Sequence, residues 1–112
     1  VLMITAARKD FPHSGKENRH ARHDVGLWTM SMLVQGISMG IYGHPMAGFS
    51  SEKARELLEI PESYDPVTAI AFGYPGSVEE APEEVRDRER ERTPRMELGE
   101  FAFPGRWGGR EA

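Results

Sequence analysis

The sequence predicts an α+β fold, in which a small sheet is flanked by helices and one long helix lies at the centre. Residues 1–7 and 66–76 are apolar runs with the composition of buried strands. Residues 25–43 carry no charge and have the length and composition of a buried helix. The chain has 112 residues, which is enough for one hydrophobic core but not for two.

The first strand pattern begins at residue 1, without a lead-in or an initiating Met. We therefore expect further sequence to precede it in the parent protein. A signal peptide is rejected, because charged residues interrupt the apolar run after only seven residues. Residues 8–22 form a polar loop. His20 and His23 near its end stand three apart, but no further ligand follows at a recognisable spacing, so we predict no metal site.

The long helix is expected to begin after Asp24, whose carboxylate would act as the N-cap. Its apolar residues occupy every side, so burial nearly all round is expected, and one small chain cannot supply it. Gly36 and Gly40 have the spacing of small residues in membrane helices, which leaves a membrane span as one explanation. The polar residues of the run and the lack of aromatic or basic belts favour the other explanation, a subunit interface. We predict a homodimer with the two glycines near its closest approach.

A Gly- and Pro-rich link follows at residues 44–49, and Ser50 then provides the N-cap of a short helix that Pro61 should stop. The strand at 66–76 is expected to pair beside the first strand. Residues 79–92 hold many acids and arginines, as in a solvated surface segment. The aromatic tail from Thr93 onward is expected to be docked.

Composition limits the partners and the compartment. Acidic residues number 18 and basic residues 14, for a net charge of -4, which argues against binding to nucleic acid or to an anionic membrane. The absence of cysteine excludes disulfides and cysteine nucleophiles, and it fits a reducing compartment such as the cytoplasm.

Taken in this order and spacing, the segments resemble the nitroreductase family over essentially the whole chain. The residues that carry the resemblance are His23-Asp24-Val25-Gly26-Leu27, Gly40-Ile41, His44-Pro45-Met46-Ala47-Gly48-Phe49, Leu57-Leu58-Glu59-Ile60-Pro61, residues 67–76, Arg95 and Leu98. The resemblance implies an α+β homodimer in which the long central helices pack across the two-fold axis and FMN lies at the subunit interface.

The resemblance also implies cofactor-binding residues. The link would pass along the isoalloxazine ring with Pro45, Met46, Ala47 and Gly48, and a backbone N–H near Ala47 would be directed at flavin N5. Small, uncharged residues permit this close approach without placing a charge against the ring. Arg95, helped by Arg92, would meet the FMN phosphate, which a guanidinium recognises with its planar fork.

The function implied is that of a flavin oxidoreductase, in which FMN takes hydride from NADH or NADPH and passes it to a flat acceptor such as a nitroaromatic or a quinone. No dedicated catalytic acid or base is expected, because the cofactor carries the difficult step. No hydrolase elbow, metalloprotease motif, P-loop or dinucleotide fingerprint argues for other chemistry.

The sequence departs from the family in two ways. Ala47 stands where many relatives have an acidic residue, so only a backbone role carries over. The helices and the Arg-Arg-Ser-like stretch with which family members begin are not found, so we interpret residues 1–112 as the C-terminal portion of a single, incomplete domain. The alternative is a truncated fragment without catalytic activity that acts only as a dimerisation or interaction module.

Overall fold

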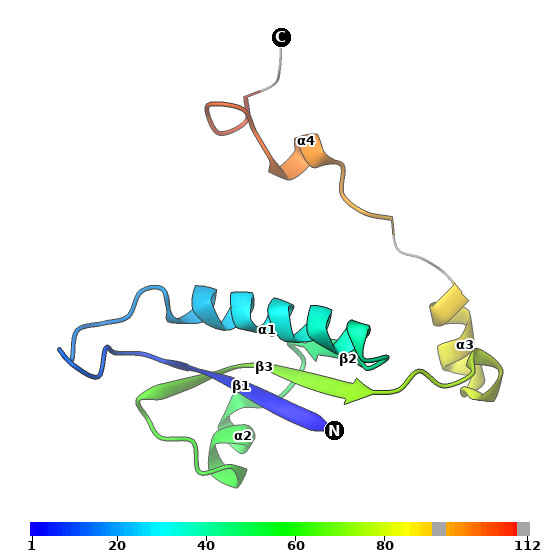
Figure 1. Ribbon diagram of the computed structural model, residues 1–112, viewed down its shortest axis with the longest axis horizontal. Helices are drawn as coiled ribbons and strands as arrows, with labels where there is room; N and C mark the ends of the chain where they lie inside the picture. Colours follow the sequence, from blue (N-terminus) through cyan, green and yellow to red (C-terminus); the bar gives the residue numbers. More distant parts are fainter. Residues whose placement is uncertain (91–93, 110–112) are drawn as a thin grey trace. The chain divides into compact units, whose positions relative to one another are not determined.

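The α+β class is confirmed in the computed structural model, which describes residues 1–90 and 94–109. The elements follow the order β1 (Leu2–Arg8), α1 (Ala21–Ser38), β2 (Tyr42–Met46), α2 (Ser51–Leu57), β3 (Tyr64–Gly73), the 3₁₀ turn η1 (Val78–Glu80), α3 (Glu83–Arg90) and α4 (Leu98–Phe101) (Figure 1). The chain divides into two compact units, which we call unit 1 (Val1–Pro75) and unit 2 (Gly76–Ala112).

Unit 1 is built on an antiparallel sheet with the strand order β1-β3-β2. The predicted pairing of the first strand with the strand near residue 70 is confirmed, since Leu2 pairs with Ala71 and Arg8 with Tyr64. Strand β2 was not predicted, because its Gly43 and Pro45 are typical of a loop. The position of β2 at the edge of the sheet explains how Pro45 fits into a strand, since an edge strand tolerates a residue that has no N–H to donate.

The two helices of unit 1 lie on opposite faces of the sheet, with α1 along one face and α2 on the other (Figure 1). The core between them is small. Ile70 in the central strand is fully buried, and Ala7, Ala69 and Thr5 are each at most 5% exposed. Leu33 of α1 reaches the sheet at Gly43, where the lack of a side chain makes room for it.

The N-cap prediction for α1 was wrong, because the helix begins at Ala21 and His20 occupies the capping position without a side-chain hydrogen bond. Asn18 accounts for the earlier start. Its side-chain oxygen accepts from the His20 N–H at 3.1 Å, and its carbonyl accepts from the Ala21 N–H at 3.2 Å. Asp24 lies in the first turn instead, where a negative charge still favours the helix N-terminus.

Helix α1 stops at Ser38, close to Gly40-Ile41 and before the end of the uncharged run at Gly43. Gly40 has a φ of 73°, the left-handed conformation that commonly terminates helices, and the Ile41 N–H donates to the Gly36 carbonyl at 2.9 Å. A Cβ on Gly36 would lie 3.0 Å from the Ile41 carbonyl oxygen. Both glycines therefore serve the turn within this chain, which is a different reason from the predicted contact between subunits.

The predicted cap of α2 is confirmed, because the Ser50 hydroxyl accepts from the Lys53 N–H at 3.2 Å. The predicted stop at Pro61 was wrong. The helix ends at Leu57, where Glu59 takes a positive φ of 51° and the Ile60 N–H returns to the Arg55 carbonyl at 3.0 Å. Local backbone geometry thus ends the helix before the proline is reached.

Unit 2 consists of η1, α3 and α4 together with the segment that follows α4. Part of the region predicted to be a solvated surface segment is helical, as α3. In the aromatic tail, the rings of Phe103 and Trp107 lie 5.2 Å apart, but Trp107 is 92% exposed within this chain. The docking of this tail stays a prediction.

Candidate functional site

The predicted cofactor-contacting residues of unit 1 lie at the end of the edge strand. Pro45 and Met46 are the last residues of β2, and Ala47 and Gly48 follow directly before Phe49 and the cap of α2. Pro45, Ala47 and Gly48 are exposed, and Met46 is half-buried. The four residues thus form one continuous, uncharged stretch of chain, which we call the link segment.

Two backbone N–H groups of the link segment are available as hydrogen-bond donors. Within the described part of the chain, no hydrogen bond has the Ala47 N–H or the Gly48 N–H as its donor. A Cβ built on Gly48 would meet nothing within 4 Å, so the space beside it is open. Sequence reasoning expected a loop throughout this segment, whereas Pro45 and Met46 belong to a strand.

The predicted phosphate contacts are less defined. Arg95 is exposed and belongs to unit 2, whereas the link segment belongs to unit 1. Arg92 lies outside the residues that the structure describes. The four residues of the link segment are consecutive in unit 1, and the phosphate contacts of Arg92 and Arg95 stay a prediction.

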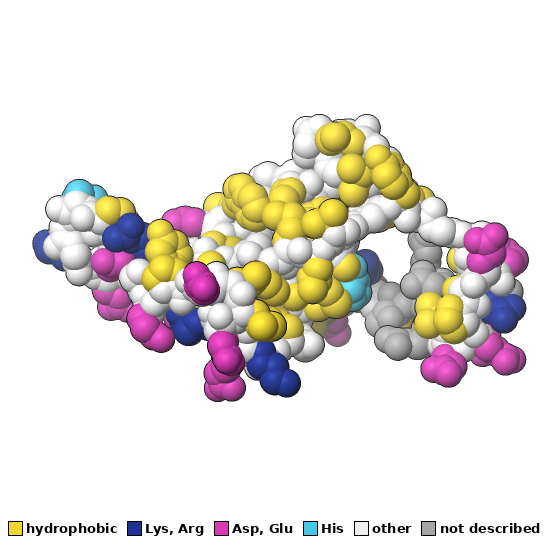
Figure 2. Space-filling model, turned by 90° about the horizontal axis from the view of Figure 1, so that it is seen from below, with side chains coloured by type: hydrophobic (Ala, Val, Ile, Leu, Met, Phe, Trp, Pro, Cys, Tyr) yellow, Lys and Arg dark blue, Asp and Glu magenta, His cyan; other side chains and the backbone are white. Residues whose placement is uncertain are grey.

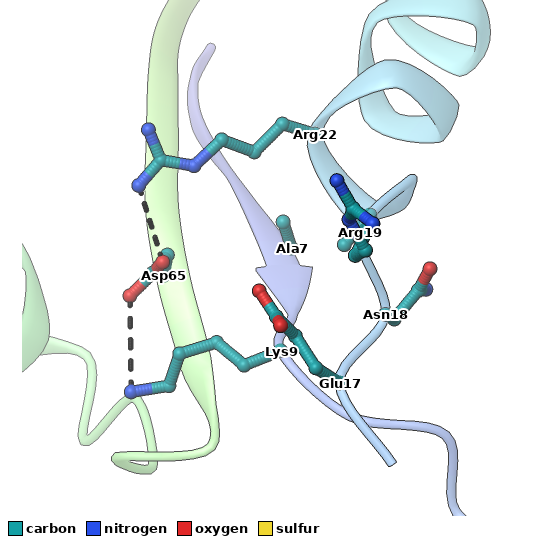
Figure 3. Close-up of a pocket in the computed structure, with 8 residues that line it drawn as sticks. Ala7, Lys9, Glu17, Asn18, Arg19, Arg22 and Asp65 are labelled. Atoms are coloured by element: carbon teal, nitrogen blue, oxygen red, sulfur yellow. Dashed lines mark hydrogen bonds and ion pairs between the residues drawn. The ribbon is translucent and has the colours of Figure 1, made fainter.

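Unit 1 has a polar pocket of about 410 Å³ away from the link segment (Figure 3). It lies beside Ala7 and Ala21 and is lined by both acids and bases. Asp65 pairs there with Arg22 at 3.2 Å and with Lys9 at 3.9 Å. Because these charges already compensate one another, we interpret the pocket as part of the fold.

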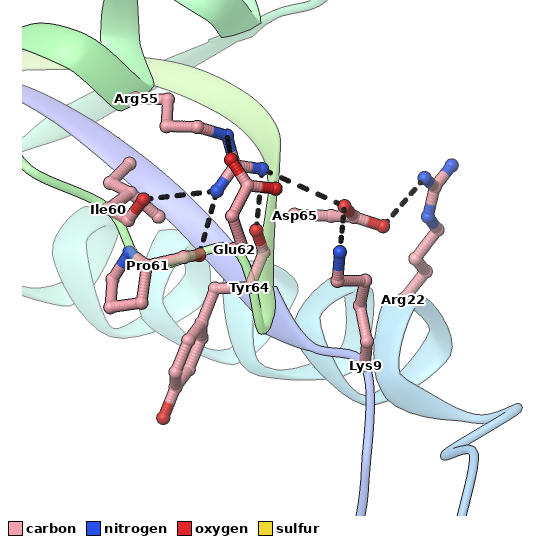
Figure 4. A network of polar contacts seen from close by, with 8 residues as sticks. All are labelled: Lys9, Arg22, Arg55, Ile60, Pro61, Glu62, Tyr64 and Asp65. Carbon is pink, nitrogen blue, oxygen red and sulfur yellow. Dashed lines mark hydrogen bonds and ion pairs between the residues drawn. The ribbon is translucent and has the colours of Figure 1, made fainter.

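Asp65 belongs to a larger network that ties α2 to the beginning of β3 (Figure 4). Arg55 donates to the carbonyls of Ile60 at 3.0 Å, Pro61 at 2.7 Å and Tyr64 at 2.7 Å, and it lies 3.9 Å from the Asp65 carboxylate. Arg8 lies over the Tyr64 ring, and its hydrogen bond to Asp10 raises the pKa of its guanidinium.

The long helix is only partly covered within this chain, as expected for one small chain. Leu27, Met30, Val34 and Ile37 are 57%, 60%, 54% and 58% exposed. Their spacing of three, four and three residues places them along one stripe of α1, which we call the α1 stripe. Hydrophobic side chains are also open over large areas of the face shown in Figure 2. Unit 1 alone therefore does not bury its apolar surface.

The sequence also raised the questions of a metal site and of a membrane span. Among the residues that the structure describes, no group of three or more His, Asp or Glu side chains is placed to hold a metal ion. Of the helices within those residues, none is both long and apolar enough to span a membrane.

A comparison with sequence families gives a match to the nitroreductase family over residues 1–74. An uncharacterised 15.4 kDa protein in the ask 5′ region of Mycolicibacterium smegmatis is 32% identical over 97 residues, which are 84% of this chain and 65% of that protein. This relative carries no function in its name.

Solved structures give the same fold. An oxidoreductase containing FMN superposes with a TM-score of 0.85 at 24% identity, over 97% of this chain and 56% of that one. The FMN-dependent nitroreductase NfnB from Mycobacterium smegmatis, in complex with NADPH, gives a TM-score of 0.58 at 21% identity, over 82% of this chain and 39% of that one. At these identities the likeness concerns the fold alone.

The family match covers well over half of the chain and includes β1, α1, β2, α2 and β3. The chain therefore belongs to the nitroreductase family, as the resemblance indicated. It spans less than two thirds of the length of the curated relative and little more than half of the FMN-containing oxidoreductase.

Proposed function

We propose that the chain supplies one wall of the FMN site of an oxidoreductase that moves hydride from NADH or NADPH to a flat acceptor, such as a nitroaromatic or a quinone. The observation that carries the proposal is the link segment, where an uncharged edge strand leads to two exposed residues whose backbone N–H groups donate no hydrogen bond within the described chain. Family membership and the folds of the FMN-containing neighbours support it.

The residues of the link segment fit an isoalloxazine ring. The open space at Gly48 lets a flat ring approach the backbone, and the N–H groups of Ala47 and Gly48 can donate to ring acceptors. Bound FMN would supply the ring that receives and returns the hydride. The link segment would hold this ring and keep water from one side of it.

The homodimer belongs to the same proposal. The α1 stripe has the alternating spacing of three and four residues by which paired helices interlock. A second copy would cover this stripe and could complete a flavin site at the interface. We place the enzyme in the cytoplasm, in keeping with a chain that has no cysteine.

Flavin binding by the purified chain tests the proposal directly. We expect FMN added to the protein to bind in a saturable way, with quenched flavin fluorescence and a shifted visible absorption band. The matched variant is Gly48→Val, which should lower flavin occupancy because its branched side chain would fill the space beside the link segment. A colourless protein that leaves FMN free at every concentration would refute the proposal for this chain.

Arg95 is the proposed phosphate contact, with Arg92 in support. Arg95→Ala should weaken FMN binding by about 1.5–3 kcal/mol, the contribution of a hydrogen bond to a charged group. Arg106→Ala removes another arginine from unit 2 and serves as the control. If fluorescence titration shows that Arg95→Ala binds FMN as tightly as the unchanged protein, Arg92 becomes the better candidate for the phosphate contact.

The exposure of the α1 stripe also favours a second candidate, a dimerisation or interaction module without catalytic activity. Both candidates need the helix to find a partner, but only the enzyme needs the link segment to bind a flavin. A chain that dimerises and does not bind FMN would support the module.

A further inference from the structure

We propose that Thr68 is a positioning residue, which fixes the direction of the Ala47 N–H toward the cofactor. The proposal rests on the proposed FMN contact of the link segment. The side-chain oxygen of Thr68, in the central strand, lies 2.9 Å from the carbonyl oxygen of Met46 and donates a hydrogen bond to it. The same hydroxyl lies 3.4 Å from the Ala69 carbonyl oxygen, which is a longer contact.

The Met46 carbonyl and the Ala47 N–H belong to one peptide group. The described chain contains no cis peptide bond, so the two bonds of this planar group point in opposite directions. When Thr68 holds the carbonyl toward β3, the Ala47 N–H must point away from the sheet. The Thr68 hydroxyl thus helps to fix the direction in which the proposed flavin donor points.

The register of β2 also predicts that the Ala47 N–H points away from β3. Antiparallel pairs alternate between hydrogen-bonded and non-hydrogen-bonded types. Pro45 has no N–H, so its pair with Ile70 is non-hydrogen-bonded. The next pair, Met46 with Ala69, is therefore hydrogen-bonded. The ladder stops at this pair, and Thr68 adds its bond at the point where the strand would otherwise fray.

Thr68 is itself held by the opposite strand. The Thr5 hydroxyl donates to the Thr68 carbonyl at 3.3 Å and accepts from the Thr68 N–H at 3.2 Å. The register shifts between Thr5 and Ala6, so a side chain here serves where the regular ladder is interrupted. Thr5 is 5% exposed, so this chain of hydrogen bonds runs from β1 through the core to the link segment.

The hydrogen bond also affects the strength of the donor. A carbonyl that accepts a hydrogen bond polarises its peptide group, which makes the N–H of that group a better donor. Loss of the Thr68 hydroxyl should therefore weaken the Ala47 N–H as well as release it.

The test compares Thr68→Val, which keeps the shape of the side chain and removes the hydroxyl, with Thr68→Ser, which keeps the hydroxyl. The control is Thr29→Val, because the Thr29 hydroxyl is buried and has no partner among the described residues. We expect Thr68→Val to raise the FMN dissociation constant about three- to tenfold, as for the loss of one hydrogen bond. Thr68→Ser and Thr29→Val should bind as the unchanged protein does.

A second readout needs no cofactor. In the flavin-free protein, the NMR order parameter of the Ala47 N–H should be near the ~0.85 of rigid backbone and should fall toward ~0.6 in Thr68→Val. Urea unfolding of the same samples would show whether the variant is folded. If Thr68→Val does not fold, the positioning role can still be tested on the unchanged protein. There the bonded Thr68 hydroxyl proton should be protected from exchange with water.

The outcomes separate the two proposals. If the unchanged protein does not bind FMN but Thr68→Val loosens Ala47, the proposed function fails and the role of Thr68 in holding the peptide remains. If the protein binds FMN and Thr68→Val changes neither the affinity nor the order parameter, Thr68 has no positioning role. A freely exchanging Thr68 hydroxyl proton would also overturn the inference.

Discussion

Gly43 is a residue of β2 that Leu33 of α1 approaches closely. A Cβ added here would meet the Leu33 side chain and would lie 2.6 Å from the Phe72 ring. The position therefore requires glycine for its size, and no left-handed φ is involved. In the sequence, Gly43 looks like any other glycine between two predicted helices, because close approach depends on a partner that only the fold supplies.

Gly43→Val should destabilise the protein by about 1–3 kcal/mol, because Leu33 and Phe72 must both move to admit the new side chain. Gly48→Val makes the same chemical change where nothing lies within 4 Å, and it should alter the stability far less. Urea unfolding followed by circular dichroism measures both free energies of unfolding. Equal losses in the two variants would contradict the proposed packing of α1 on β2.

At the scale of the elements, α2 is held at both ends. Ser50 caps its first turn, and Arg55 binds three carbonyls between the end of the helix and the beginning of β3. The link segment enters α2 through this cap. A firmly held α2 therefore fixes the far end of the link segment, while Thr68 fixes the near end.

Arg55→Ala should lower the free energy of unfolding by about 1–3 kcal/mol, because it leaves partly buried carbonyls without their charged donor. Arg55→Lys should recover only part of this loss, since an ammonium group lacks the planar fork that reaches several acceptors at once. Lys53→Ala, on the same helix, is the control. A stability of Arg55→Ala equal to that of the control would show that the bonds contribute nothing.

The elements that the sequence predicted well are those with a strong local signal. The β1 and β3 patterns are dense in apolar and β-branched residues, and Ser50 precedes a helix with a suitable face. Strand β2 was missed because Pro45 forbids a central strand, and an edge position cannot be read from local sequence. The early start of α1 was missed because Asn18 competed with Asp24 as a helix-starting residue.

The candidate site shows the same division. The link segment was predicted from the resemblance to a family, and its uncharged residues are visible in the sequence. Thr68 was not found, because a threonine within an apolar run is typical of any strand. Its hydroxyl acquires a role only when the register sets it beside Met46, and the register depends on residues far away in the chain.

At the scale of the whole molecule, the proposed dimer depends on the α1 stripe, which is exposed within a single chain. Val34→Glu should shift the protein from dimer to monomer, because a charge would have to enter an apolar contact in both copies. Light scattering across a dilution series measures the change. Gly36→Leu is unsuitable for this purpose, since the glycine already contacts Ile41 within its own chain.

Gln35→Glu is the matched control for this prediction, because it adds the same charge to the same helix at an exposed polar position beside the stripe. It should leave the dimer intact. An unchanged chain that is monomeric and cooperatively folded at micromolar concentration would contradict the dimer, and with it the proposed burial of the α1 stripe.

The strand order β1-β3-β2 also has a consequence for how the protein is made. The central strand is the last of the sheet to leave the ribosome, and both of its neighbours are synthesised before it. Until β3 emerges, β1 and β2 have no partner within unit 1, so every ladder must form between segments distant in sequence. Such pairings close long loops and form slowly. We therefore expect the nascent chain to carry two unpaired strands during this interval, when exposed strand edges are most prone to aggregate.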